Sequence, residues 1–487
     1  MIADKKERSV VVSITRPETR TAQRSVQIRF SERRVLLILV DSVLVVASAR
    51  GIAWIWHETG LTRLQVPVLG NLWLWVLVTL VGWWVLALLN DLYDVPTSSN
   101  TPLTTKRLAV VGATAGMLLV MAWLLDLGLP PPVYSLQLLL VTILAVAAWR
   151  WLYAVSTYRP PFLHRVLVVG GGSRGRAVID LLQQGPGAKC SVVGFVDDDA
   201  AGRATMAGAA ELVGDERDLP QLASELGVHE IVMAKDRNLE PHLFEHLVDC
   251  QAQGLRVSWM PDLYGRFYRQ TPIEYIDPVW VLQAIQGRPI FSRLQQGSKR
   301  LLDLIVVILA LPATLLILVP VAIAIRLDSP GPIFYRQTRA GKGNRNFSIF
   351  KFRTMVVDAE KDGRAKWAEE NDPRITHVGR ILRKARLDEL PQVLNVLRGE
   401  MSLVGPRPER PEFVQELQHA VPFYRTRLMV KPGITGWAQV QYDYGSSTQD
   451  AMNKLQYDFY YIQYWSLWMD LYILYRTIWV MVGLKGR

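Results

Sequence analysis

Residues 299–326 read KRLLDLIVVILALPATLLILVPVAIAIR, a run of 22 uncharged residues (304–325) with basic side chains at both ends. About 20 apolar residues are enough for a helix to span the hydrocarbon core of a bilayer. Because both flanks are basic, the positive-inside rule gives this run no direction of crossing. Pro312 and Pro320 lie within it, and proline kinks a helix by removing a backbone hydrogen bond. We therefore predict a re-entrant helix that breaks at one of these prolines and returns to the same membrane face, with an ordinary fifth span as the alternative.

The start of this run carries Lys299 and Arg300. In a helix that returns to the face it left, both side chains lie at the depth of the lipid headgroups, where they could bind a lipid phosphate. We predict both as phosphate-binding residues.

Four further apolar stretches precede this run, and each has about the length of a transmembrane helix. They cover about 35–56, 71–90, 108–125 and 133–155. Basic residues alternate between the loops in a pattern that places both ends of the bundle in the cytoplasm. We predict a cytoplasmic tail over 1–34 and four transmembrane helices over 35–157. Asp41 and Arg50 are charges in the first helix, either functional or simply facing water or a neighbour.

The composition agrees with membrane segments joined to water-soluble domains, because 50% of the 487 residues are hydrophobic and 20% are charged. The two cysteines, Cys190 and Cys250, exclude a disulfide-stapled secreted domain and most cysteine-based metal sites. The net charge of +11 favours anionic lipid or phosphate ligands over nucleic acid. We expect a lipid bilayer, and no nucleic acid, among the partners.

Residues 163–285 have the pattern of a soluble α/β domain. A buried-strand run leads into a G-x-G-x-x-G loop at Gly170, Gly172 and Gly175, and a second strand ends at Asp197. An acid about 20 residues beyond such glycines is typical of a dinucleotide-binding Rossmann fold. We predict a Rossmann-like domain with these four residues as nucleotide-binding candidates. The alternative is that the glycines only permit close packing of strand and helix.

Asp388 and Glu389 stand beside several cations in the C-terminal third. Adjacent residues point about 100° apart on an α-helix, so the two are poorly placed as a facing acid and base. They could divide the work, one attacking phosphorus and the other helping to hold Mg²⁺. The competing interpretation is a solvated helix face with neighbouring leucines packed inward.

Four cations near this pair could offset the charge of a phosphate. They are Lys351, Arg353, Arg383 and Arg407. Alternation and glycines before Lys351 and Arg353 predict a β-hairpin that presents both, and Arg383 lies in a basic helix predicted over 379–386. For any single arginine of this set, a surface salt bridge is the competing explanation.

Seven ordered motifs over about 140 residues closely resemble those of the bacterial sugar transferase family, the polyprenyl-phosphate hexose-1-phosphate transferases. The motifs are Lys299-Arg300…Asp303, Ser329-Pro330-Gly331-Pro332, Lys351-Phe352-Arg353-Thr354-Met355, Asp372-Pro373-Arg374-Ile375-Thr376, Asp388-Glu389-Leu390-Pro391-Gln392, Gly405-Pro406-Arg407-Pro408 and Pro432-Gly433-Ile434-Thr435-Gly436. With its four-helix bundle and glycine-loop domain, the chain is similar to the long form of the monotopic phosphoglycosyl transferases. It resembles the undecaprenyl-phosphate glucose phosphotransferases that initiate exopolysaccharide synthesis.

The resemblance implies a membrane α plus α/β fold in the bacterial inner membrane, with a cytoplasmic catalytic domain. It divides the chain into the tail, the four-helix transmembrane bundle, a Rossmann-like (CoA-binding-like) domain over 163–285, and a re-entrant helix with an α/β catalytic domain over 296–487. It implies that Asp388 attacks the sugar-bearing phosphorus of a UDP-sugar and releases UMP. Undecaprenyl phosphate then takes the phosphosugar from Asp388. Mg²⁺ would bind near Glu389, with Asp388 as the second candidate ligand.

Three positions depart from the family pattern. Leu311 precedes Pro312 where the family's re-entrant helix commonly breaks at Ser-Pro, so either Pro312 or Pro320 could be the break. Arg386 stands two residues before Asp388, where many members carry serine. Gln441 follows the Pro-Gly-Ile-Thr-Gly region where the family often reads Asn-Gly-Arg, so an arginine contact to the sugar or phosphate is missing there.

Two other functions stay open from the sequence. A membrane-bound nucleotide-sugar dehydratase shares the bundle and glycine loop, but it needs a second dinucleotide motif and Tyr-x-x-x-Lys after residue 300, and this chain has neither. A non-catalytic scaffold for polysaccharide export would not need Asp388 or Glu389. Glucose, galactose and N-acetylated sugars all remain candidates for the donor, and exopolysaccharide, capsule and O-antigen for the pathway. We also expect a homodimer, and we expect residues 465–482 to form either a surface-bound or a core helix.

Overall fold

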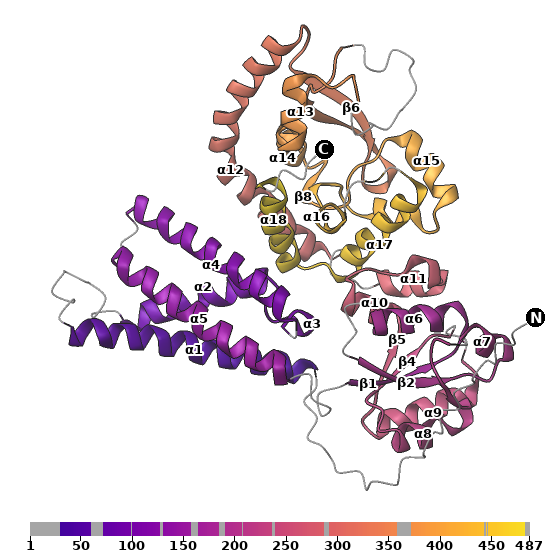
Figure 1. The fold of residues 1–487 in the computed structure, drawn as a ribbon. Helices are drawn as coiled ribbons and strands as arrows, with labels where there is room; N and C mark the ends of the chain where they lie inside the picture. The colour runs from indigo at the N-terminus through magenta and orange to yellow at the C-terminus, as the bar shows by residue number, and fades with distance from the viewer. Residues whose placement is uncertain are drawn as a thin grey trace, which may run out of the picture.

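The computed structural model describes residues 30–59, 72–98, 100–126, 130–156, 164–184, 190–206, 208–235, 239–286, 292–357, 372–442, 445 and 447–482. Most of the predicted tail lies outside the described residues. Figure 1 shows three parts: a bundle of long helices, a middle part with a central sheet, and a larger C-terminal part with helices around short strands. We call them the bundle (30–156), the middle part (164–286) and the C-terminal part (292–482).

The bundle contains a helix for each of the four predicted apolar stretches and one short further helix, α3, which the sequence did not predict. They are α1 (Phe30–Glu58), α2 (Leu72–Leu89), the short α3 (Val95–Ser98), α4 (Thr101–Leu124) and α5 (Pro132–Ser156). By length and composition, α1, α4, α5 and α12 of the C-terminal part could each cross a membrane, and α2 adds a shorter apolar helix. Apolar residues of α1, α2, α4 and α5 form one shared core, while large apolar side chains remain exposed on the outside. This distribution is the one expected of helices surrounded by lipid.

The two charges of the first helix have neighbours within the structure. The Asp41 carboxylate lies 2.6 Å from the guanidinium of Arg150 on α5, and both side chains are almost fully buried. The Arg50 guanidinium stacks over the ring of Trp73. These contacts favour the simpler of the two interpretations, in which each charge faces a neighbour.

The middle part is a doubly wound α/β unit, as predicted. Its five strands pair in parallel in the order β3-β2-β1-β4-β5. They are β1 (His164–Val169), β2 (Cys190–Val196), β3 (Leu212–Gly214), β4 (Glu230–Met233) and β5 (Arg256–Trp259). The helical elements are α6 (Gly172–Gln184), α7 (Ala200–Thr205), η4 (Glu216–Asp218), α8 (Leu219–Glu225), α9 (Pro241–Ala252), α10 (Met260–Phe267), η5 (Ile273–Tyr275) and α11 (Pro278–Ile285). One core lies between the sheet and α6 with α10, and a second lies under α8 and α9.

The C-terminal part joins a long helix to a small α/β unit. Its strands are β6 (Phe334–Ala340) and β7 (Asn346–Phe352), which form the predicted antiparallel hairpin, and β8 (Ser402–Val404) and β9 (Gly433–Thr435), which pair in parallel. Its helical elements are α12 (Arg293–Asp328), η7 (Lys342–Asn344), α13 (His377–Lys384), η8 (Leu387–Gln392), α14 (Val393–Arg398), α15 (Pro411–Ala420), η9 (Tyr424–Met429), α16 (Trp437–Gln441), α17 (Thr448–Tyr464) and α18 (Leu467–Val482). The helix α13 is the predicted basic helix.

The helix α12 is continuous through Pro312 and Pro320, so the predicted break at one of them is not seen. Figure 1 shows it as a long, curved helix along the outside of the C-terminal part. Both of its ends pack on that part: Asp303 accepts hydrogen bonds from β8, and Asp328 accepts one from the backbone N–H of Val378. Leu316, in the middle of the helix, is 78% exposed. A helix that crossed a bilayer would separate its two ends, so this packing favours a helix that stays on one side.

The C-terminal core extends into the middle part. Apolar residues of η5 and α11 are buried in one cluster with residues of α15 and α17. The ring of Trp280 lies 6.0 Å from that of Phe459, for example. The structure therefore packs residues 273–285, which the sequence assigns to the Rossmann-like domain, with the C-terminal part. The helix α18 also belongs to a core cluster of the C-terminal part, through Tyr472 and Ile473.

Candidate active site

The two adjacent carboxylates, Asp388 and Glu389, lie in the short 3-10 helix η8. Their residues are 8% and 7% exposed, while Leu387 and Leu390 pack against the cluster that joins α12, β7 and α13. The alternative of a solvated helix face is therefore wrong, because the acids are buried together with the leucines. Arg386, at the start of η8, has a φ of 54°, a left-handed conformation that turns the chain sharply out of α13.

Two predicted cations converge on Glu389. The Lys351 ammonium, at the end of β7, lies 2.8 Å from Glu389 Oε1, and the Arg407 guanidinium, which follows β8, lies 2.9 Å from the same oxygen. Burial alone would raise the pKa of Glu389, but Arg407 and Lys351 outweigh it and lower that pKa. Glu389 is therefore held ionised by one cation from β7 and one from the segment that follows β8.

Asp388 has a different electrostatic environment although it is the next residue. Burial raises its pKa, and the negative charge of Glu389 adds to this effect, while Lys351 and Arg383 lower it in part. The net result is a carboxyl whose pKa lies above that of an ordinary aspartate. Environments that push the pKa values of two neighbouring acids apart are typical of catalytic pairs with separate roles.

The remaining predicted cation of this set, Arg353, lies away from the two acids. Its guanidinium donates hydrogen bonds to the carbonyl oxygens of Pro330 and Ser329, at 2.8 and 2.7 Å. Gly331 has a φ of +124°, and a Cβ there would meet the Arg353 guanidinium. Arg353 thus stabilises the Ser-Pro-Gly-Pro turn at the end of α12.

Lys299 and Arg300 also have internal partners at the start of α12. The Lys299 ammonium lies 2.7 Å from the Asp470 carboxylate of α18, and Arg300 donates to the carbonyl oxygens of Val396 and Leu397 at the end of α14. Neither contacts the acids of η8. A direct contact of these two residues with phosphate stays a prediction.

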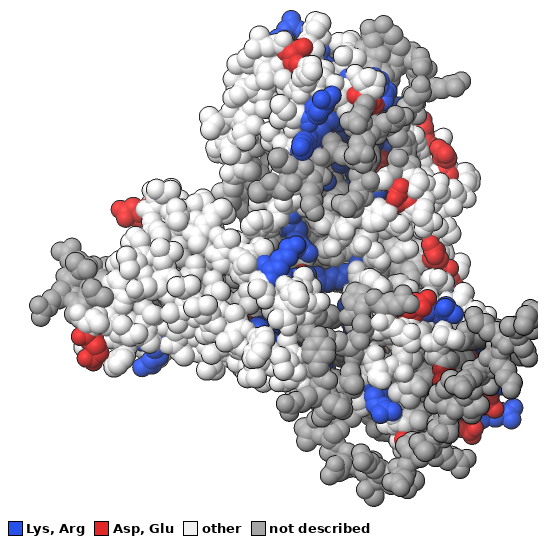
Figure 2. Space-filling view, viewed as in Figure 1, with Lys and Arg blue, Asp and Glu red and all other residues white. Residues whose placement is uncertain are grey.

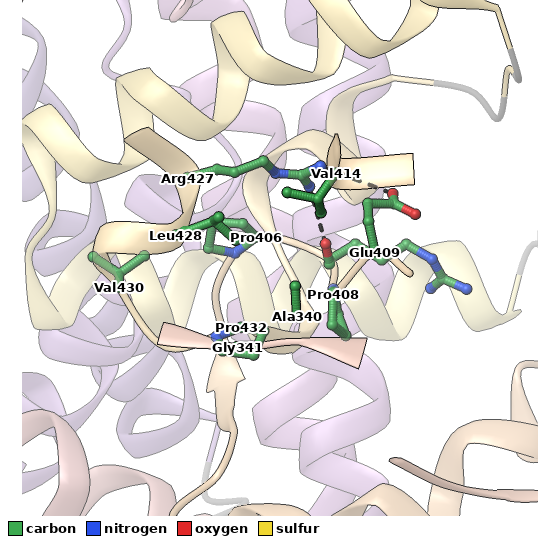
Figure 3. A pocket seen from close by; sticks show the side chains of 11 residues that line it. Ala340, Gly341, Pro406, Pro408, Glu409, Val414, Arg427, Leu428, Val430 and Pro432 are labelled. Carbon is green, nitrogen blue, oxygen red and sulfur yellow. Dashed lines mark hydrogen bonds and ion pairs between the residues drawn. The ribbon is translucent and has the colours of Figure 1, made fainter. Parts of the chain in front are cut away.

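Sequence reasoning missed Arg427, which holds the backbone of Arg407 through a hydrogen bond. The Arg427 guanidinium donates a 2.9 Å hydrogen bond to the carbonyl oxygen of Arg407 and lies 3.0 Å from the Asp458 carboxylate. Burial raises the pKa of Asp458 to about 6 in spite of Arg427. Figure 3 shows Arg427 and Glu409 at a small cavity, which is also lined by Pro406 and Pro408, the prolines that flank Arg407. No motif in the sequence marks Arg427, because its partner lies 31 residues further along the chain.

The glycine loop of the middle part packs against its own domain. Asp197, at the end of β2, accepts a 2.8 Å hydrogen bond from the backbone N–H of Gly171. A Cβ on Gly175 would lie 2.4 Å from the carbonyl oxygen of Gly170, so this glycine allows α6 to pack closely on β1. Gly170 and Gly172 have positive φ angles of 100° and 69°. These contacts explain the glycines by packing, and nucleotide binding at Gly170, Gly172, Gly175 and Asp197 stays a prediction.

The acids of η8 fit the donor chemistry of a magnesium ion. Mg²⁺ is bound by hard oxygen ligands and commonly takes only one or two carboxylates, with substrate phosphates and water as the other ligands. Glu389 uses Oε1 for Lys351 and Arg407, which leaves Oε2 as an oxygen that could bind a metal. Asp388 would be the second candidate ligand.

Comparison with known proteins identifies the class of protein. Residues 294–484, which include all of α12 but its first residue, η8 and both cation contacts of Glu389, match the family model described as bacterial sugar transferase. The chain is 48% identical over 223 residues to a UDP-glucose:undecaprenyl-phosphate glucose-1-phosphate transferase of Caulobacter vibrioides, a match that covers 45% of this chain and 82% of the relative. The chain belongs to the bacterial sugar transferase family. The predicted enzyme class, a phosphoglycosyl transferase, is thereby confirmed at the level of the family.

Two further relatives differ in their named sugar. A UDP-N-acetylgalactosamine-undecaprenyl-phosphate N-acetylgalactosaminephosphotransferase of Aeromonas hydrophila is 45% identical over 207 residues, which are 42% of this chain and 48% of that protein. A UDP-glucose:undecaprenyl-phosphate glucose-1-phosphate transferase of Xanthomonas campestris pv. campestris is 33% identical over 327 residues, or 66% of this chain and 67% of that protein. The match thus spans about half of the first relative and two thirds of the second.

Proposed function

We propose that this protein transfers a sugar-1-phosphate from a UDP-sugar to undecaprenyl phosphate and releases UMP. The observation that carries the proposal is the division between the two acids of η8. Glu389 is ionised and held by Lys351 and Arg407, while Asp388 is buried beside it with a raised pKa. The names of the three relatives describe the same type of reaction, which supports it.

In the first half of the reaction, a carboxylate oxygen of Asp388 attacks the sugar-bearing phosphorus of the donor. The bond from this phosphorus to the bridging oxygen breaks, and UMP leaves with that oxygen. Asp388 then carries the phosphosugar as an acyl phosphate. Lys351, Arg383 and Arg407 are placed near the acids to offset the negative charge of the two phosphates.

In the second half, a phosphate oxygen of undecaprenyl phosphate attacks the same phosphorus. The bond between phosphorus and the Asp388 oxygen breaks, so the carboxylate is restored and undecaprenyl-diphosphate-sugar leaves. A bound Mg²⁺ would neutralise phosphate charge as a Lewis acid, with Glu389 as its main ligand. Two half-reactions at one aspartate give a ping-pong mechanism.

We place this reaction at the cytoplasmic face of the bacterial inner membrane. The packing of both ends of α12 on the C-terminal part supports a catalytic part on one side of the bilayer. The donor class is a UDP-hexose or its N-acetylated form, and the product would begin the assembly of an exopolysaccharide, a capsule or an O-antigen. A homodimer remains a prediction.

The test is nucleotide release by the full-length protein in purified membranes. A panel of UDP-sugars is supplied with undecaprenyl phosphate and Mg²⁺, and UMP and UDP are separated. We expect UMP from one donor, and we expect Asp388→Asn to lower its release by at least about a thousandfold, since removal of a nucleophile abolishes the covalent route. The control is Glu412→Gln on α15, whose side chain is 63% exposed. Release of UDP would instead indicate an ordinary glycosyl transferase, and unchanged activity of Asp388→Asn would exclude the aspartyl intermediate.

A further inference from the structure

Asp91 joins all three parts of the molecule at one carboxylate. It follows α2, and its side chain is 7% exposed. Its oxygens accept a 2.6 Å hydrogen bond from Arg107 on α4, a 2.9 Å hydrogen bond from Arg269, which follows α10, and a 2.5 Å hydrogen bond from the Tyr472 hydroxyl on α18. The bundle, the middle part and the C-terminal part each contribute one donor.

Further contacts beside Asp91 join the bundle to the same helix. The Asn90 amide donates a 2.9 Å hydrogen bond to the Tyr475 hydroxyl, which lies 3.4 Å from the hydroxyl of Thr114 on α4. Leu89 packs against the core cluster that contains Tyr472. Figure 2 shows basic side chains gathered where the bundle meets the rest of the molecule. We call this set of contacts, centred on Asp91, the three-part junction.

The charge at the junction is well defined. Burial by itself would raise the pKa of Asp91, but Arg269 and Arg107 outweigh it and lower that pKa. The carboxylate is therefore ionised; it accepts hydrogen bonds from two guanidinium groups, and that of Arg476 on α18 lies 4.0 Å away. Removing one partner of a buried, hydrogen-bonded ion cluster is costly because the other charges stay buried.

The helix α18 continues the connection to α12. Two residues before Tyr472, the Asp470 carboxylate lies 2.7 Å from the ammonium of Lys299 and accepts a hydrogen bond from Tyr461. One short helix thus contacts the bundle through Tyr472 and Tyr475, and the start of α12 through Asp470. Since the bundle and α12 are both apolar on their outer faces, the angle between them sets how the C-terminal part sits on the bilayer.

We propose that Asp91 is a positioning residue for the lipid-dependent half of the reaction: through α18 it fixes α12, and with it the site of Asp388, at the membrane depth where the phosphate of a polyprenyl phosphate can reach the phosphosugar. This inference rests on the proposed function. The first half-reaction uses a water-soluble donor and does not depend on that depth, whereas the second half uses an acceptor that is confined to the bilayer.

The test separates the two half-reactions in the full-length protein reconstituted in phospholipid vesicles. The variant is Asp91→Asn, because Asp91 has a φ of 54° and asparagine tolerates this left-handed conformation while it removes the charge. The matched control is Asp94→Asn, which changes a neighbouring acid that is 36% exposed and 4.0 Å from Arg269. For Asp91→Asn we expect an unchanged burst of UMP without acceptor. We expect transfer to undecaprenyl phosphate to fall about ten- to a hundredfold, as a misplacement of about 1 Å can cause.

Three other outcomes have distinct meanings. Full transfer activity in Asp91→Asn would overturn the inference, and so would equal loss of the burst and of transfer, which indicates a purely structural role.

Tyr472→Phe provides a second variant in case Asp91→Asn does not fold, because it removes one donor to Asp91 and keeps the buried ring. It should also lose transfer while it keeps the UMP burst, but to a smaller degree. The absence of a UMP burst in the wild-type protein would overturn the proposed function itself. Because this measurement needs no variant at Asp91, it distinguishes that failure from a failure of the present inference.

Discussion

At the scale of single residues, the two acids of η8 differ because of what surrounds each of them. Glu389 contacts Lys351 of β7 and Arg407 of the segment after β8, and it stays ionised. Asp388 is equally buried, but the nearby cations do not outweigh the effects of burial and of the Glu389 charge, so its pKa is raised. A nucleophilic carboxylate with a raised pKa is a stronger base than an ordinary aspartate, which favours attack on phosphorus.

The raised pKa of Asp388 predicts an unusual pH dependence. Only the ionised carboxylate attacks, so the rate of the UMP burst should fall as pH is lowered through the raised pKa, well above the value near 4 of an ordinary aspartate. Glu389→Gln removes a like charge and should move the midpoint of any residual burst to lower pH. Stopped-flow burst rates between pH 4 and 8 measure both effects. A wild-type midpoint at the ordinary aspartate value would contradict this assignment.

Lys351 provides a second prediction at this scale. Lys351→Met nearly keeps the length of the side chain but removes one of the two cations that contact Glu389 Oε1 and leaves Arg407, so the pKa of Glu389 should rise and the C-terminal part should lose roughly 3–5 kcal/mol of stability. We expect activity to fall and the unfolding midpoint in denaturant to decrease. Lys384→Met, at an exposed position of α13, is the control. It should leave activity unchanged and alter the free energy of unfolding by no more than about 0.5 kcal/mol. Equal effects of the two variants would show that the ion pair is unimportant.

At the scale of elements, α12 is the feature in which sequence and structure differ most. The two prolines predict a break, but the helix is continuous and curved. A proline removes one hydrogen bond and bends a helix without having to end it, and neighbouring packing can hold the bend. Val307 in the first half of α12 and Ile325 near its end both pack against the C-terminal part, which supplies that packing.

The course of α12 in the membrane can be tested with single cysteines. Leu294 and Leu327, near the two ends of α12, are 85% and 83% exposed. In intact spheroplasts, a membrane-impermeant thiol reagent should label neither Leu294→Cys nor Leu327→Cys, and it should label both once the membrane is opened. Labelling of Leu327→Cys alone in intact spheroplasts would mean that α12 crosses the bilayer.

The control for this experiment is Thr59→Cys, in the exposed turn after α1, which the predicted topology places outside the membrane. It should be labelled in intact spheroplasts. The two native cysteines should not interfere, because both are buried and burial raises the pKa of Cys190 to about 12 and that of Cys250 to about 11. A thiol that is not ionised reacts slowly with such reagents.

At the scale of the whole molecule, the boundary between the middle and C-terminal parts does not follow the sequence pattern. The alternation of strands and helices places residues 273–285 with the sheet, yet η5 and α11 share a core with α15 and α17. The reason is physical: an apolar helix packs on whichever apolar surface is free, and the sheet of the middle part is already covered by α6, α8, α9 and α10.

This shared core predicts that Trp280 stabilises the C-terminal part from outside the matched family region. Trp280→Ala removes a buried ring that packs on Phe459, and we expect a loss of about 3–5 kcal/mol in unfolding free energy. Heat inactivation of UMP release should occur at a clearly lower temperature. Val279→Ala, next to it but 59% exposed, is the control and should leave the inactivation temperature nearly unchanged. Similar inactivation temperatures for both variants would mean that α11 contributes little to this core.

The sequence alone determined the features that depend on local pattern. Apolar length predicted the bundle helices, alternation predicted the β6–β7 hairpin, and the glycine loop predicted the parallel sheet of the middle part. The adjacent acids and the nearby cations could also be named in advance, because the motifs that contain them are short and continuous. These signals are readable because helix and strand periodicity and turn residues act over a few positions.

Only the tertiary structure decided which groups meet. It brought Lys351 and Arg407 to one oxygen of Glu389 while it used Arg353 to close a turn, and it connected the bundle to α18 through Asp91. Residues 91 and 472 are 381 positions apart in the chain, and such pairings leave no local pattern because they arise from how whole elements pack. Burial then set the charge of each acid, since the cost of removing a carboxylate from water depends on all of its neighbours together.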